Sequence, residues 1–89
     1  MPELTRFYGI VITMYPEAGE RHNTPHFHAR YAGNHATLAI STGEILAGTL
    51  PRSQLRLVQA WVELHRADLD AVWTALTSGQ AAWKIDPLH

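Results

Sequence analysis

The sequence feature that most constrains this chain is a hairpin signal centred on Gly33-Asn34. This dipeptide suits the positive φ angles of a two-residue turn, and it lies between two short segments, 26–31 and 35–40, in which side chains of different character alternate. A turn there pairs apolar residues with each other: Tyr31 with Ala36, Ala29 with Leu38 and Phe27 with Ile40. A shift of one residue would mix the two faces, so the pattern predicts two antiparallel strands that share one apolar face.

The opposite face of the first strand carries His26, His28 and Arg30, because successive side chains of a strand point to opposite sides. The same turn places Thr37 opposite Arg30 and Ala39 opposite His28. Small residues therefore line the row, and we expect both imidazoles to project outward with room above them.

Other segments complete the predicted sheet. Residues 5–15 are apolar on both alternating sets, which is typical of a central strand. Residues 16–24 are polar, contain Pro and Gly and lack periodicity, which indicates a loop. A second turn at 41–44 leads into residues 44–50, a further predicted strand. The sheet is thus predicted as a four-stranded antiparallel meander.

The C-terminal half has the apolar periodicity of helices. Pro51 suits a first helical turn, and apolar residues then recur at Leu55, Val58, Val62, Leu69, Val72 and Leu76. We expect two helices, 51–64 and 66–78, with a break near 63–67; one long kinked helix is the alternative. Gly79 marks the end of the helical region, and the alternating residues 83–86 indicate a short edge strand before Pro87.

Together these elements predict one α+β domain over residues 1–89, with both helices packed on one face of the sheet. The chain has 89 residues, of which 46% are hydrophobic, enough for one small core. Cysteine is absent, which excludes disulfides and thiolate metal sites and agrees with a reducing cytosol. There is no secretory signal pattern and no apolar stretch approaching about 18 residues, so we expect a soluble cytoplasmic protein without a membrane partner.

The charge balance narrows the class of partner. Seven Lys and Arg stand against eight Asp and Glu, a formal net charge of -1. Non-specific affinity for nucleic acid comes mostly from basic residues, so this balance argues against nucleic acid as the main partner. The edge strands and small core are compatible with a homodimer.

The His26-X-His28 pair is a candidate metal site. Strand alternation places both imidazoles on one face, about 6.6 to 6.8 Å apart along the strand, and neutral imidazole suits zinc or another transition-metal ion. A third ligand is needed; His22 completes the candidate set, and His35 and Glu20 are also near in sequence. The alternative is a pair of histidines hydrogen-bonded at the surface of a sheet.

Acid-base catalysis is a second candidate for the same residues. His26 and His28 could exchange protons with a substrate while Arg30 stabilises developing charge, as metal-free ribonucleases require. No substrate groove or basic track is readable in the sequence, so whether the protein is an enzyme stays open. Arg52 and Arg56 are four residues apart and are interpreted as solvated helix surface.

Several of these stretches together resemble a known family. Residues 7–10 (FYGI), 25–31 (PHFHARY), 43–46 (GEIL), 50–51 (LP) and the Trp61–Arg66 segment are similar to a family of short bacterial proteins classed as a domain of unknown function, with a PPHFHARYG and GEIL.G.LP signature. The chain departs from that signature at Thr24, where the family usually has a first proline.

The resemblance implies a kind of partner and a place for a site, but no reaction. Genes of this family often stand beside a gene for another short protein, and such pairs are suspected of acting as toxin-antitoxin systems. The resemblance therefore implies a bacterial interaction module that binds a protein partner from an adjacent gene. It also implies that a functional site, if the protein has one, lies at His22, His26, His28 and Arg30. The alternative is a small enzyme or metal-binding protein built on the face of His26, His28 and Arg30.

Overall fold

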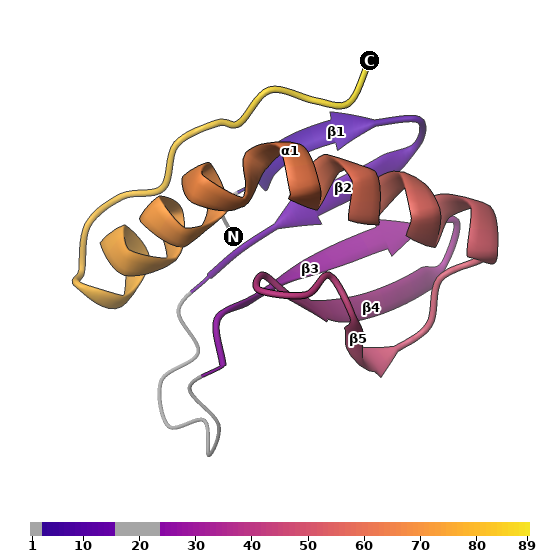
Figure 1. Cartoon of the computed structure of the whole chain (residues 1–89), viewed down its shortest axis with the longest axis horizontal. Coiled ribbons are helices and arrows are strands. Elements are labelled where there is room, and N and C mark those ends of the chain that lie inside the picture. Colours follow the sequence, from indigo (N-terminus) through magenta and orange to yellow (C-terminus); the bar gives the residue numbers. More distant parts are fainter. Residues whose placement is uncertain (1–2, 16–23) are drawn as a thin grey trace.

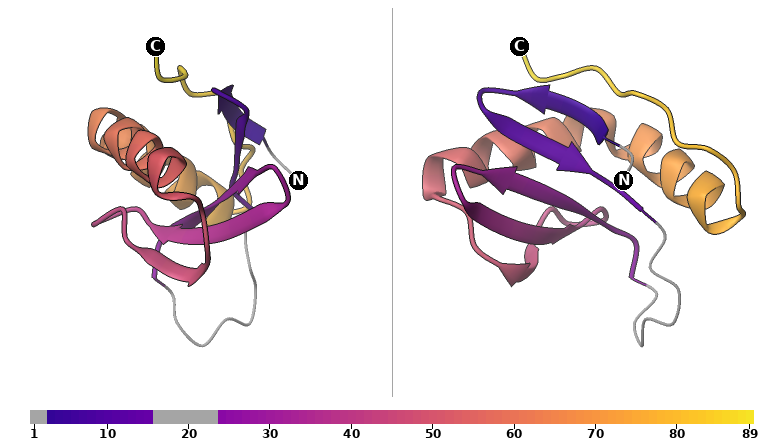
Figure 2. Two further views of the ribbon diagram at one scale, coloured as in Figure 1. Left: turned by 90° about the vertical axis from the view of Figure 1, so that its right-hand side faces the viewer. Right: turned by 180° about the vertical axis from the view of Figure 1, so that it is seen from behind.

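The computed structural model describes residues 3–15 and 24–89. The elements are, in chain order, β1 (Glu3–Phe7), β2 (Ile10–Thr13), β3 (His26–Tyr31), β4 (Asn34–Ala39), β5 (Ile45–Gly48) and α1 (Arg52–Thr77). The strands form one antiparallel sheet in the order β1-β2-β3-β4-β5, and α1 crosses one face of it (Figures 1 and 2). The predicted α+β meander with a helical layer on one face is confirmed, but the sheet has five strands rather than four.

The first apolar segment forms two strands, so the prediction of a single strand over 5–15 is wrong. Tyr8 and Gly9 have φ angles of 50° and 77°, and the chain reverses at these two residues between β1 and β2. Phe7 and Ile10 are register partners, so the core-facing positions change from odd to even numbers across the turn. This change explains why both alternating sets of the segment are apolar.

The turn between β3 and β4 lies one residue earlier than predicted. Ala32 and Gly33, with φ angles of 46° and 84°, form the turn, and β4 spans Asn34–Ala39 rather than 35–40. Each β3 residue therefore faces a β4 residue two positions earlier than predicted: His28 faces Thr37, and Arg30 faces His35. A two-residue shift leaves the faces of both strands unchanged, so the predicted shared apolar face is confirmed.

The last strand is shorter than predicted. β5 spans Ile45–Gly48, within the expected 44–50, and its pairing with β4 shifts between Thr37 and Leu38. Ile45 packs against the core, whereas Leu46 is 51% exposed.

The helical region is one helix rather than two. α1 runs from Arg52 to Thr77 with a kink at His65, where φ is -123° and ψ is 22°. The predicted break near 63–67 is therefore present as a kink, as in the alternative of one long helix. Gly79 donates to the carbonyl oxygen of Leu76 and Gln80 to that of Ala75, which ends the helix where the sequence predicts. Within the described residues no helix has the length and hydropathy needed to span a lipid bilayer.

The core lies between the sheet and α1. Trp61 is fully buried at its centre, with its ring centroid 5.8 Å from that of Phe7 and 6.0 Å from that of Phe27. Apolar side chains of every strand and of both halves of α1 complete the same cluster.

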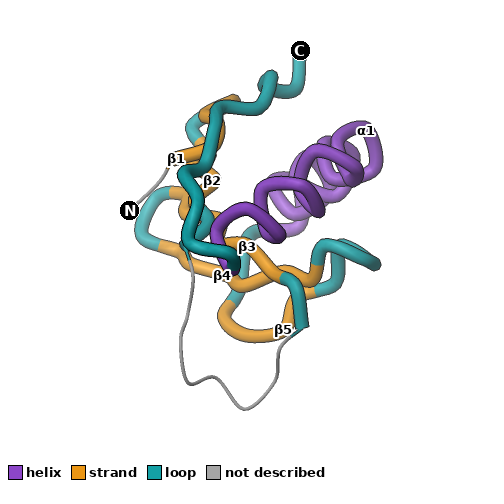
Figure 3. The backbone as a smooth tube through the Cα atoms, turned by 90° about the vertical axis from the view of Figure 1, so that its left-hand side faces the viewer, coloured by secondary structure: helices purple, strands orange, loops and turns teal. Residues whose placement is uncertain are grey.

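The C-terminal segment forms no strand, so the predicted edge strand over 83–86 is wrong. The segment nevertheless runs beside β1 (Figure 3). The Ile85 N–H donates to the carbonyl oxygen of Leu4 at 2.9 Å, and the indole N–H of Trp61 donates to that of Asp86 at 2.7 Å. Among the residues that the structure describes, this one backbone hydrogen bond joins the segment to the sheet, and it is not continued into a ladder of bonds.

Candidate functional site

His26 and His28 are buried, with 6% and 7% of their surface exposed, so the expectation that they project into open solvent is wrong. The ring of Tyr15 stacks on that of His28, at a centroid distance of 4.6 Å and an angle of 4°. His26 lies against Trp73 of α1, with centroids 5.0 Å apart. The two imidazoles themselves meet edge to face at 5.4 Å. Aromatic rings therefore fill the space that the predicted register left empty.

The shifted register places three polar side chains in one network. The Nδ1 atom of His28 lies 3.1 Å from the Nε2 atom of His35 and 3.2 Å from the hydroxyl oxygen of Thr37. A neutral imidazole has one donor and one acceptor nitrogen, so a single proton lies between the two rings. The network fixes the orientation of His35, whose own side chain is exposed.

The tautomer of His26 follows from its hydrogen bond. Its Nδ1 atom lies 2.8 Å from the carbonyl oxygen of Thr24, which can only accept. Nδ1 therefore carries the proton, and the lone pair of the neutral ring is on Nε2. Histidines that bind metals through Nε2 commonly make this kind of bond through Nδ1.

The structure describes only some of the candidate metal ligands, namely His26, His28 and His35. His22 and Glu20 lie outside the described residues. Among residues 3–15 and 24–89, no group of three or more His, Asp or Glu side chains is arranged to hold a metal ion. A site built on His26 and His28 thus requires a ligand from outside those residues, and the metal set stays a prediction.

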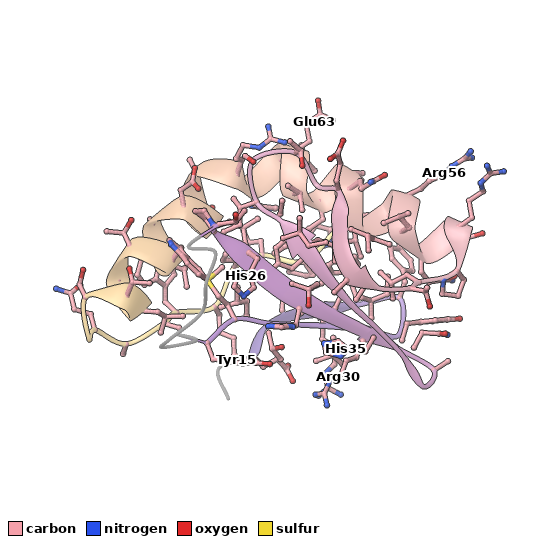
Figure 4. All side chains as sticks on the ribbon, turned by 90° about the horizontal axis from the view of Figure 1, so that it is seen from below. Tyr15, His26, Arg30, His35, Arg56 and Glu63 are labelled. Atoms are coloured by element: carbon pink, nitrogen blue, oxygen red, sulfur yellow. The ribbon has the colours of Figure 1, made fainter. Side chains whose placement is uncertain are left out.

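Arg30 belongs to a row that crosses four strands on the face opposite α1. Successive register partners are Arg6 with Val11, Val11 with Arg30, and Arg30 with His35. We call these four residues the cross-strand row. Arg6, Arg30 and His35 are exposed, and Val11 is half-buried between them. Figure 4 shows Arg30 and His35 together on the sheet side of the molecule, with Arg56 and Glu63 projecting from α1 on the other side.

The two arginines of the row differ in their partners. The guanidinium of Arg6 donates to the carboxylate of Glu3 at 2.7 Å, and this bond is the main cause that lowers the pKa of Glu3 and raises that of Arg6. The Nζ atom of Lys84 lies 3.7 Å from the same carboxylate. Arg30, by contrast, forms no ion pair or hydrogen bond through its side chain with any residue of the described part of the chain.

A depression of about 390 Å³ lies at the end of the sheet where the turns β1–β2 and β3–β4 meet. Its lining consists of Gly9, Val11, Arg30, Tyr31, Ala32, Gly33, Asn34 and His35. Two members of the cross-strand row, Arg30 and His35, therefore supply the cationic and imidazole groups of this depression.

Sequence reasoning missed three features of this region. It assigned Tyr15 to an apolar set of one long strand, it named His35 only as a nearby ligand, and it did not connect Trp73 with the histidines. The first two errors come from the β1–β2 turn and the two-residue shift. The third error concerns the contact between Trp73 of α1 and His26, which are far apart in the chain, so no local pattern in the sequence predicts it.

Comparison with known proteins places the chain in a family. No curated protein and no solved structure gives a match. The family described as a domain of unknown function, DUF4160, matches residues 9–74, which is more than half of the chain and includes β2 to β5 and most of α1. The chain therefore belongs to the DUF4160 family.

Proposed function

We propose that this domain is a bacterial protein interaction module that binds its partner across the sheet face opposite α1. The observation that supports this most directly is the cross-strand row, which presents Arg6, Arg30 and His35 on that face. Four adjacent strands hold the backbone of these residues at spacings of about 4.8 Å, so the strands that carry the row are already in place. The backbone therefore pays no further ordering cost when a partner binds, and only the exposed side chains lose rotamer freedom.

Charge supports an acidic partner segment. The carboxylate of Glu3 on this face already has Arg6 and Lys84 as partners, whereas Arg30 has none among the described residues. On α1, three carboxylates (Glu63, Asp68, Asp70) are balanced by three arginines (Arg52, Arg56, Arg66). The cross-strand row carries two arginines, and the sheet side therefore offers an acidic segment a positive charge, that of Arg30, without a carboxylate partner among the described residues.

The partner that we propose is the product of an adjacent gene, because genes of the family that this sequence resembles often stand beside a gene for another short protein. In such a toxin-antitoxin-like pair, one protein would neutralise the other by covering a surface. Neither role requires a deep cleft in this chain.

A measurement of the affinity between this protein and the product of the adjacent gene tests the proposal. The pair would be co-expressed, separated and titrated by calorimetry, with Arg30→Glu and Arg56→Glu as matched charge reversals on opposite sides of the molecule. Because a carboxylate placed against an acidic segment is repelled, Arg30→Glu should weaken binding at least about tenfold, and Arg56→Glu should leave it unchanged. Failure of the two proteins to bind, or equal loss in both variants, would contradict the proposal.

Metal binding is a second candidate because Nδ1 of both buried histidines is engaged, by Thr24 in one ring and by His35 and Thr37 in the other. Histidines oriented through Nδ1 in this way commonly bind metals through Nε2, so His26 and His28 would bind zinc with His22 as the proposed third ligand. Zinc titration of the wild type should then give one tight site that is lost in His26→Ala and retained in His89→Ala. Equal zinc binding in the two variants would rule out these ligands.

A further inference from the structure

We propose that the depression between the two hairpin turns is an anchor site for one carboxylate group, bound by Arg30 and His35. The inference rests on the proposed function, because an acidic segment of a partner would supply the carboxylate. It adds the chemical group that is recognised and the place where it binds.

The depression has a suitable size and a rigid frame. Its volume of about 390 Å³ falls in the range of small-ligand sites and could hold one side chain or chain end. The turns on either side lie close together, since a Cβ atom on Gly9 would be only 3.3 Å from the ring of Tyr31. Glycine at this position allows the β1–β2 turn to approach β3 closely. The walls therefore do not need to form when the ligand binds.

Arg30 supplies the charge. Arg30 is one of the residues that line the depression, and its guanidinium has no ion-pair partner among the described residues. A guanidinium presents a planar fork of N–H donors that matches the two oxygens of a carboxylate. One positive charge also matches the single negative charge of a carboxylate, whereas a phosphate dianion would keep an unpaired charge.

His35 supplies a second donor. Its Nε2 atom is engaged by His28, and no described residue forms a hydrogen bond with its Nδ1 atom. When His28 Nδ1 donates to His35 Nε2, the proton of the neutral His35 ring is on Nδ1, where a carboxylate oxygen can accept it. The buried network of His28 and Thr37 thus has a use at the surface: it orients the imidazole that lines the depression.

Short capped peptides test the anchor site without the partner. The probes are Ac-Gly-Gly-Glu-Gly-Gly-amide, with only a side-chain carboxylate; Ac-Gly-Gly-Gly-Gly with a free C-terminus; and Ac-Gly-Gly-Gln-Gly-Gly-amide, with neither. Each is titrated into ¹⁵N-labelled protein while the amide signals of Val11, Arg30, Ala32 and Gly33 are followed. Arg30→Gln is the test variant and Arg52→Gln, on the exposed start of α1, is the control.

At least one of the two carboxylate probes should shift these signals, and the one that does identifies a side chain or a chain end as the source. Arg30→Gln should weaken that probe about tenfold or more, because it removes a charged hydrogen-bond donor, while Arg52→Gln should have no effect. Equal shifts with the glutamine probe, no shift with either carboxylate, or stronger binding of inorganic phosphate would overturn the anchor site.

The two proposals can fail separately. If the partner protein binds and Arg30→Glu weakens it while no carboxylate probe reaches the depression, the docking face stands and the anchor site falls. If the probes bind through Arg30 but the adjacent gene product does not, the anchor site stands and the proposed pairing falls.

Discussion

His28 illustrates how a residue with a surface-like sequence environment becomes buried. Alternation alone placed it on the polar side of a strand, and in the sheet it does share the face of Arg30, two residues further along β3. Tyr15, His35 and Thr37 then cover it and satisfy its Nδ1 atom. Buried polar groups are tolerated when they have such partners, and removal of one partner leaves the others unsatisfied.

Substitution of His28 should therefore destabilise the fold. We expect His28→Ala to lower the free energy of unfolding by about 1 to 3 kcal/mol, because the Thr37 hydroxyl loses a partner and Tyr15 loses its stacking surface. Arg30→Ala on the same strand is the control and should change it by less than about 0.5 kcal/mol, since that side chain is exposed. Urea denaturation measures both. A loss in His28→Ala no larger than in the control would show that the network has no structural role.

The carboxylate of Glu3 permits a titration test. Its pKa is lowered mainly by the hydrogen bond from Arg6, so the stability it contributes is present above its unfolded pKa and is lost as pH falls through the lowered folded value. Arg6→Gln should raise the pKa of Glu3 toward its ordinary value, and Lys84→Gln should raise it less, because Lys84 contributes the smaller effect. Side-chain carbon chemical shifts, followed against pH, measure both. A larger rise in Lys84→Gln would reverse the assigned order of causes.

At the scale of elements, the β4–β5 hairpin depends on a close backbone contact. Gly48 has a φ angle of 77°, and a Cβ atom there would clash with the carbonyl oxygen of His35. Such a clash involves two backbones, so a side-chain rotation cannot relieve it. The position of β5 beside the cross-strand row therefore requires glycine at 48.

Two alanine substitutions separate this clash from the cost of a positive φ angle. Gly48→Ala should lower the free energy of unfolding by at least about 2 kcal/mol, because overpacking adds to backbone strain. Gly33→Ala has a similar φ angle of 84° but open space around its Cβ, so it should cost only about 1 kcal/mol. Thermal or urea unfolding measures the difference. Equal costs would mean that β5 moves away from β4 without penalty.

The kink of α1 at His65 lies between two contacts of the helix with another part of the fold. No proline or glycine lies in Arg52–Thr77, so the common local causes of a kink are absent from the helix. Arg66, next to the kink, donates to the carbonyl oxygen of Ile40 at 3.2 Å, and Gln59 before it donates to that of Gly43 at 2.9 Å. Both halves of the helix are thus tied to the segment between β4 and β5.

At the scale of the whole molecule, the C-terminal segment joins the two layers. Ile85 is 6% exposed and bonds to β1, while Asp86 accepts from the central Trp61 of α1. Ile85→Ala should therefore lower the free energy of unfolding by about 2 to 4 kcal/mol. Trp83→Ala, at a side chain that is 45% exposed, should cost less than about 1 kcal/mol. Denaturation with hydrogen exchange at Ile85 measures both, and equal costs would show that the segment contributes little to stability.

The arrangement of the candidate residues on the sheet, though not their role, could be predicted in part. The sequence placed His26, His28 and Arg30 on one face, and the structure agrees, because period-two alternation survives a two-residue error in the turn. It could not predict that Arg30 faces His35 and that His28 faces Thr37, because those pairs depend on which two residues adopt positive φ angles. The depression could not be predicted from the sequence either, because it forms only when the β1–β2 turn lies beside the β3–β4 turn.

The sequence by itself determined the α+β class, the shared apolar face of β3 and β4 and the extent of the helical region, because these follow from local periodicity and turn residues. The tertiary structure alone decided that residues 5–15 contain a turn, that α1 is one kinked helix and that the histidines are buried. The physical reason is the same in each case. Turn position, helix bending and burial depend on contacts between residues far apart in the chain, and local propensity does not specify those contacts.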